Sequence, residues 1–86
     1  MKVLMTPIGM VAWFTQEGIL HPLKYKIDYD GEATVVKVDH ILLRTEEKLA
    51  GNKQIIFRCQ SVIDNLLKVF ELKYEVNTCK WYLYKA

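Results

Sequence analysis

The stretch that decides the fold spans residues 53–76 and reads KQIIFRCQSVIDNLLKVFELKYEV. Asp64 and Asn65 lie between two apolar-rich runs and favour a two-residue turn, because both residue types tolerate a positive φ. With that turn, alternate side chains of the two runs share one apolar face, while Arg58 lies opposite Glu71 on the other face. The apolar face pairs Ile63 with Leu66, Cys59 with Phe70, Phe57 with Leu72 and Ile55 with Tyr74. The stretch therefore predicts a β-hairpin.

Two further turns separate the same kinds of residue. A turn at Asp30–Gly31 predicts a hairpin that pairs Leu23 with Val38, Tyr25 with Val36 and Ile27 with Thr34. A turn at Asn77–Thr78 pairs Tyr74 with Trp81 and Leu72 with Leu83, and it sets Glu75 against Lys80 outside. The first of these turns also sets Lys24 against Lys37, a like-charge pair that we expect a β-bulge near Pro22 to relieve.

Turn signals at short intervals predict six strands, at 10–14, 19–29, 33–43, 53–63, 66–76 and 80–84. The polar stretch 45–51 predicts a single helical turn, which Thr45 caps and Gly51 ends. No longer helix is expected, because no segment keeps helical periodicity over roughly 12 residues. The expected fold is all-β, a small antiparallel barrel or roll of about five to six strands that is SH3-like or related.

The three registers also predict the core. Side chains on the shared apolar faces point inward, and side chains of the first strand are expected to join them. The predicted core comprises Val11, Trp13, Tyr25, Ile27, Val36, Val38, Ile55, Phe57, Phe70, Leu72, Tyr74, Trp81 and Leu83.

Length and composition limit the possible classes of protein. The 86 residues suffice for a single small domain over 1–86, but not for two cores. The chain is 51% hydrophobic, which is rich for this length, so either the core is dense in rings or apolar surface remains for a partner. Pro7 and Gly9 interrupt the apolar start, so we expect no secretory signal, and no apolar run approaches the ~20 residues of a membrane span. These features predict a cytoplasmic protein.

Cysteine and histidine, the residues most often used in catalytic or metal sites, form no recognisable constellation. Cys59 and Cys79 face strand positions about 20 Å apart, which is too far for a disulfide, so we expect two free thiols, with Cys59 in the core. His21 and His40 fall opposite each other if the Asp30–Gly31 register continues, but further metal ligands are missing there. Nucleotide and acyl-transfer motifs are also missing. We expect no enzymatic activity, no metal and no cofactor.

Several apolar side chains fall on the outer face of the last three predicted strands. Segment 3–8 covers them, or they form a contact with another chain, and the last strand is then an unprotected edge. The favoured hypothesis is a non-enzymatic protein-interaction module that associates with itself, as a homodimer or other homo-oligomer, or with another protein. The interface candidates are Ile56, Val62, Leu67, Val69, Tyr82 and Tyr84.

The alternative hypothesis is a small β-barrel that binds nucleic acid through basic and aromatic surface residues. The net charge of +2 argues weakly against it, because phosphate-binding proteins carry a clearer basic excess. Its candidate residues are Lys24, Lys26, Tyr29, Lys48 and Lys53. A membrane surface is not expected as a partner.

The stretches EKLAGNKQIIFRCQS and FELKYEVNTCKWYLYK, with WFTQEGILHPLKYKI upstream, resemble a group of short uncharacterised proteins from Gram-positive bacteria. The resemblance covers most of the chain. It implies a stand-alone cytoplasmic domain, and it brings no activity, cofactor or catalytic residue.

Overall fold

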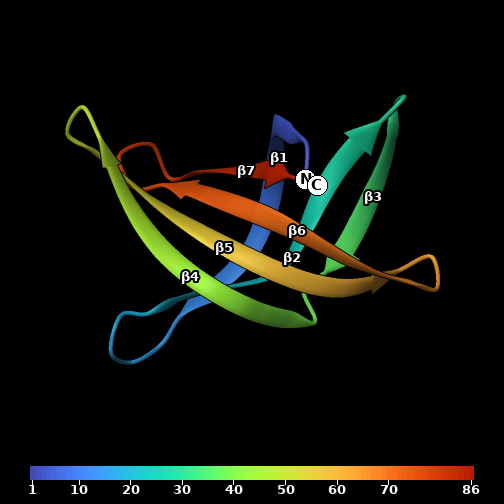
Figure 1. Ribbon diagram of the computed structural model, residues 1–86, viewed down its shortest axis with the longest axis horizontal. Coiled ribbons are helices and arrows are strands. Elements are labelled where there is room, and N and C mark those ends of the chain that lie inside the picture. Colours follow the sequence, from blue (N-terminus) through green and yellow to red (C-terminus); the bar gives the residue numbers. More distant parts are fainter.

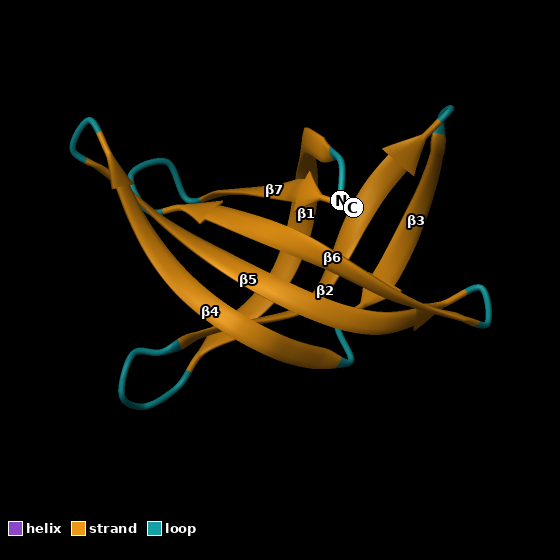
Figure 2. Ribbon diagram, in the orientation of Figure 1, coloured by secondary structure: helices purple, strands orange, loops and turns teal.

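The computed structural model describes residues 1–86, except for the side chain of Tyr29. It is all-β, and Figure 2 shows strands and loops with no helix in the described chain. The strands are β1 (Val3–Phe14), β2 (Leu20–Tyr29), β3 (Glu32–Lys37), β4 (His40–Leu49), β5 (Asn52–Ile63), β6 (Leu66–Glu75) and β7 (Lys80–Lys85).

All seven strands belong to one antiparallel sheet in the order β3-β2-β1-β7-β6-β5-β4. The sheet coils, so that β4, β5 and β6 run across β1 and β2 in Figure 1. The two ends of the order, β3 and β4, do not pair with each other. The prediction of a small antiparallel all-β fold is confirmed, while the closed barrel is wrong, because both edge strands stay open. The predicted count of about five to six strands is also wrong, because the sheet has seven.

Strand β1 joins the two halves of the sheet. Its first half, from Val3 to Ile8, pairs with β7, and its second half, from Gly9 to Phe14, pairs with β2. The N-terminal segment therefore extends the sheet beside β7 instead of covering the outer face. The expectation of an unprotected last strand is wrong for the same reason.

The hairpin registers inferred from the turns are confirmed. Around Asp64–Asn65 every predicted pair is present, and the Arg58 guanidinium lies 2.9 Å from the Glu71 carboxylate. The pairs of the other two hairpins lie in the predicted register, with the Val38 amide donating to the Leu23 carbonyl at the end of one ladder. A bulge does occur beside Pro22, in the β1–β2 ladder, but Lys24 still faces Lys37, so the predicted relief is wrong.

Two predicted segments have different structures. The expected strand 33–43 is divided into β3 and the start of β4 by a corner at Val38–Asp39. The Asp39 amide donates to the Ser61 hydroxyl and its carboxylate accepts from the Val62 amide, so the corner is tied to β5. The expected helical turn at 45–51 is wrong, since 45–49 continue β4 and Ala50–Gly51 form a hairpin turn into β5.

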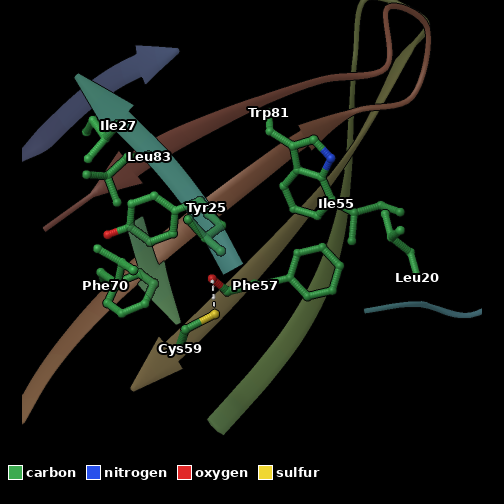
Figure 3. Close-up of a cluster of buried hydrophobic side chains, with 11 residues drawn as sticks. Leu20, Tyr25, Ile27, Ile55, Phe57, Cys59, Phe70, Trp81 and Leu83 are labelled. Carbon is green, nitrogen blue, oxygen red and sulfur yellow. Dashed lines mark hydrogen bonds between the residues drawn. The ribbon is translucent and has the colours of Figure 1, made fainter. Parts of the chain in front are cut away.

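The core lies on the concave face of the coiled sheet, where β2 and β3 meet β5, β6 and β7 (Figure 3). The Tyr25 and Phe70 rings meet edge to face with centroids 5.7 Å apart, and Phe57 stacks on Trp81 at 5.6 Å. The predicted core residues outside β1 are buried or, for Val38 and Tyr74, half-buried. Leu20 joins them without having been predicted.

The predicted phase of β1 is wrong. Trp13 and Val11 are both 50% exposed, whereas Ile8, Met10 and Ala12 pack against the core. Side chains alternate along a strand, so a phase assigned without a hairpin partner has two equal possibilities.

Candidate interaction surface

Strand β4 is an edge of the sheet, and all ten of its residues are exposed. It pairs with β5 on one side only, so the backbone groups directed away from β5 lack a ladder partner. Residue Leu42 is an extra residue between the pairs Ile41–Cys59 and Leu43–Arg58, which makes a β-bulge near the start of the strand. The remaining stretch, from Leu43 to Leu49, is regular and available for pairing.

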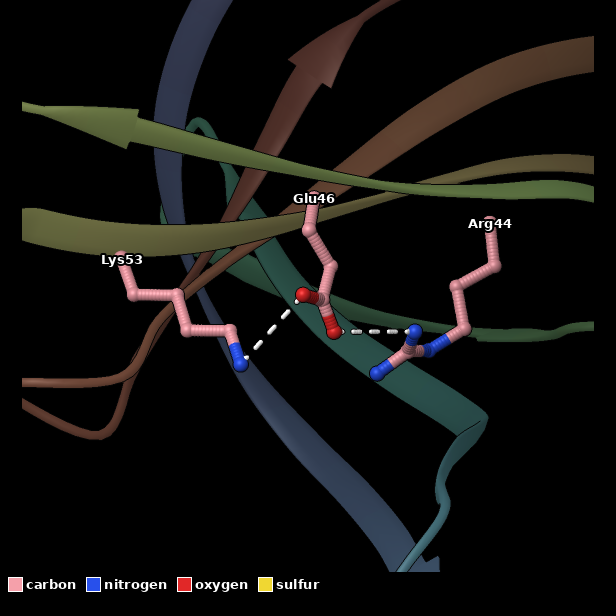
Figure 4. A network of polar contacts seen from close by, with 3 residues as sticks. All are labelled: Arg44, Glu46 and Lys53. Atoms are coloured by element: carbon pink, nitrogen blue, oxygen red, sulfur yellow. Dashed lines mark hydrogen bonds and ion pairs between the residues drawn. The ribbon is translucent and has the colours of Figure 1, made fainter.

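Three charged side chains meet on the concave side of this edge (Figure 4). The Glu46 carboxylate lies 3.2 Å from the Arg44 guanidinium and 3.3 Å from the Lys53 ammonium. The hydrogen bond and charge of Lys53, with a smaller contribution from Arg44, lower the pKa of the Glu46 carboxyl. Opposite charges from β4 and β5 therefore hold each other in place on this face.

The Arg44 side chain also lies at one end of the core, beside Phe57. Its guanidinium carbon lies 5.9 Å from the centroid of the Phe57 ring, beside a hollow between the start of β2 and β4. Both His21 and His40 line this hollow, and His21 stacks on Trp13 at 5.5 Å. Among the described residues, no three or more His, Cys, Asp or Glu side chains gather as a metal would require.

The outer face next to β4 is largely covered by its own side chains. One row runs Thr45, Ile56, Lys73 and Tyr82 across neighbouring strands, and Ile56 is only 7% exposed within it. The Lys73 ammonium sits 3.8 Å from the centroid of the Tyr84 ring. Three of the interface candidates, Ile56, Tyr82 and Tyr84, therefore present little or only part of their surface to a partner.

The other three interface candidates form an exposed apolar group at the end of the β5–β6 hairpin, which we call the hairpin patch. Val62 lies directly opposite Leu67, and Val69 follows two residues later on the same face. Val62 is 60% exposed and Leu67 is 65% exposed, so the patch meets solvent.

The candidates for nucleic-acid binding are divided between two parts of the sheet. Lys24 and Lys26 point outward from β2, whereas Lys48 and Lys53 face each other on the β4–β5 hairpin. The Tyr29 side chain lies outside the described residues. Lys37, which was not a candidate, joins Lys24 and Lys26 on the outer face.

The two cysteines are free, as expected, and they differ in environment. Cys59 is fully buried, and burial, followed by the nearby Glu71 carboxylate, raises the pKa of its thiol to about 12. Cys79 is exposed in the β6–β7 turn. The burial of Cys59 opposes the thiolate form, which a nucleophilic cysteine needs.

Sequence reasoning placed residues 40–43 in a strand but missed the rest of β4, including Arg44, Thr45 and Glu46. The available signal was Ala50–Gly51, since a glycine in second position fits a two-residue hairpin turn. Pairing about that turn sets Lys48 against Lys53 and Thr45 against Ile56, as in the structure. The turn at Ala50–Gly51 was not predicted from the sequence, because alanine in first position rarely adopts a positive φ.

The fold and this surface define a small all-β protein, an open antiparallel sheet with one long exposed edge. No protein-family model, curated protein or solved structure matches the chain. In the described residues there is no helix with the length and apolar character of a membrane span.

Proposed function

We propose that the protein is a non-enzymatic interaction module that joins copies of itself through the β4 edge. The observation that carries the proposal is a ten-residue edge strand that is exposed throughout. An unpaired strand is a template for a further strand, and its free backbone groups supply the affinity. Leu42, Leu43 and Leu49 add exposed apolar surface along the same edge.

Charged residues on an edge usually prevent pairing, and β4 carries four of them. This protection is strongest where charges of one sign face each other. Here Arg44, Glu46 and Lys48 share one face of β4 and alternate in sign, so a second chain with the same pattern can be matched in charge. The charges on β4 therefore favour a partner strand of matching charge and disfavour pairing with other strands.

Sedimentation velocity over protein concentrations from micromolar to millimolar tests the proposal. We expect a monomer that converts to a dimer as the concentration rises. A monomer at every concentration would contradict self-association.

The hairpin patch provides the competing contact surface, and a matched pair of variants separates it from the edge. Val62→Lys places a charge in the patch, and Val11→Lys places one at another exposed valine, on the other half of the sheet. If β4 is the contact strand, both variants associate like the wild-type protein. Selective loss in Val62→Lys would move the interface to the hairpin patch.

We propose a cytoplasmic location as well. Two free thiols, one of them in the core, support it, since thiols persist in a reducing compartment. Fractionation of the source cells, followed by detection of the protein, tests the location.

A second candidate function is binding of single-stranded nucleic acid, and the lysines of β2 and β3 favour it. Lys24 directly faces Lys37, and Lys26 lies two residues along the same face. Across the described side chains, none of the three is within ion-pair distance of a carboxylate. The exposed Trp13 ring on neighbouring β1 offers a base a surface for stacking.

Fluorescence anisotropy with labelled oligonucleotides across a salt series tests this candidate. Three phosphate contacts predict that log K falls with log[salt] with a slope of about −2. The double variant Lys24→Glu/Lys26→Glu should lose binding, while Lys48→Glu on the distant hairpin should retain it. A lack of affinity at low salt would eliminate nucleic acid as a partner.

A further inference from the structure

We infer that β4 pairs with β4 of a second copy, antiparallel, about a two-fold axis at Thr45. The inference rests on the proposed function and specifies its contact. It is carried by the order of charges along β4 and by the position of the bulge.

The symmetry of such a pair limits the possible registers. Two antiparallel strands that continue one sheet are related by an axis perpendicular to the sheet, and directly opposite residues lie on the same face. The axis must therefore pass beside one residue, which then faces its own copy. The register is defined by the choice of that residue.

With the axis at Thr45, every close charge contact in the middle of the interface is favourable. Arg44 of each copy lies opposite the partner's Glu46, so two ion pairs form across the axis. Within each copy Arg44 already lies 3.2 Å from Glu46, so the four charges alternate in sign around a square. Opposite charges in directly facing positions stabilise a strand pair, whereas like charges destabilise it.

The neighbouring registers lack this match. An axis at Arg44 sets two guanidinium groups against each other, and an axis at Glu46 or Glu47 does the same with two carboxylates. An axis at Leu43 avoids like charges, but it places the bulge at Leu42 inside the contact. The Thr45 register is the one that combines a regular strand with matched charges.

On the outer face of the same register, Leu43 of one copy lies opposite the partner's Glu47, whose alkyl stem can cover it. The bulge at Leu42 ends the regular ladder just beyond this pair. Leu43 is 52% exposed in the single chain, so the contact removes apolar surface from water. A contact of one strand per copy is smaller than a standard interface, and the dimer should be weak and concentration-dependent.

Two variants of opposite charge at Thr45 test the axis. Thr45 is exposed, so neither variant should prevent folding, which circular dichroism checks. Thr45→Lys and Thr45→Glu each place like charges face to face on the axis, and each should weaken the dimer about fivefold or more. A mixture of tagged Thr45→Lys with untagged Thr45→Glu should form heterodimers that co-purify, because opposite charges then meet.

A charge exchange tests the ion pairs, and the second edge supplies the control. Arg44→Glu should weaken the dimer, and Arg44→Glu/Glu46→Arg should restore it, since the exchange regenerates both pairs. Thr34→Lys, at an exposed threonine on edge strand β3, should dimerise like the wild-type protein.

Three outcomes would overturn the inference. A wild-type dimer that is insensitive to both Thr45 variants removes the axis but leaves self-association intact. Assemblies that grow beyond a dimer point to β3 of one copy pairing with β4 of the next, which is an open-ended contact. A wild-type protein that stays monomeric removes the inference and the proposed function together.

Discussion

The two thiols are the clearest contrast between single residues. Cys59 is buried and the pKa of its thiol is raised to about 12, whereas Cys79 is exposed. Because the thiolate is the reactive form, iodoacetamide at pH 8 should label one cysteine per native chain and both in guanidinium chloride. Mass spectrometry of the native protein should find the label on Cys79, and Cys79→Ser should abolish it. Rapid native labelling of Cys59 would contradict its burial.

Truncation of the two large rings at Phe57 and Trp13 should lower the stability of the protein by very different amounts. Phe57 is completely buried, so Phe57→Ala should lower the free energy of unfolding by about 3–5 kcal/mol. Trp13 is 50% exposed and its ring stacks on His21, so Trp13→Ala should cost about 1 kcal/mol or less. Urea unfolding measures both losses, and similar losses for the two variants would contradict the phase of β1.

The same two residues explain where residue-level prediction worked. Phe57 was assigned correctly because Asp64–Asn65 fixes the position of both strands, and the ladder then determines every side chain. Trp13 was assigned wrongly because residues 15–19 between β1 and β2 form no two-residue turn, and the β1–β2 ladder contains a bulge between Val11 and Ala12, so no turn signal fixed the register. Composition favoured a buried tryptophan, but only the register decides the face.

Among the elements, the hairpin turns are stabilised to different degrees. Asp30–Gly31 and Asp64–Asn65 place suitable residues at positive φ, whereas Ala50 adopts a φ of 49° in the β4–β5 turn. A side chain with Cβ in this region costs roughly 1 kcal/mol, and asparagine tolerates it better. Ala50→Asn should therefore raise the free energy of unfolding by about 0.5–1 kcal/mol in urea titrations.

The matched substitution for that turn is Gly51→Ala. Gly51 adopts a φ of 85°, and a Cβ there would have open space but a strained backbone. This variant should lose stability by about 1 kcal/mol. A gain from Gly51→Ala, or a loss from Ala50→Asn, would be inconsistent with the observed turn.

This turn also accounts for the largest error at the level of elements. Residues 45–51 carry residues that favour helices, and local propensity predicted a helical turn. In the structure β5 provides a ready ladder for the same residues, and pairing overrides propensity. The second half of the candidate contact strand was therefore invisible to local signals, and the pairing of β4 with β5 was not predicted.

For the whole molecule, the important difference from the expected barrel is the pair of open edges. Sequence registers specify which strands form hairpins, but they do not state whether the first and last members of the sheet order meet. Here the long-range pairing is that of β1 with β7, and β3 and β4 do not pair with each other. The proposed function depends on this feature, because a closed barrel would have no edge for a second copy.

The β1–β7 pairing brings the two ends of the chain together, as Figure 1 shows. The Lys2 amide donates to the Ala86 carbonyl at 2.7 Å, and the Ala86 amide donates back to Lys2 at 3.0 Å. A short glycine linker from residue 86 to residue 1 should therefore fit without strain, and a circular permutant opened at the exposed Gln16–Glu17 loop should fold. Its circular dichroism spectrum and unfolding midpoint should stay close to those of the wild-type protein.

A second permutant, opened between Val38 and Asp39, is the matched comparison. That corner holds backbone and side-chain hydrogen bonds to Leu23, Ser61 and Val62, so it links β2 to β5 across the interior. Opening it frees both edge strands at the point where the coiled sheet is tied together, and the permutant should unfold at a clearly lower urea concentration. If instead the corner permutant proved the more stable of the two, the ends of the chain would not be held by β1 and β7. The open sheet that exposes β4 would then need a different explanation.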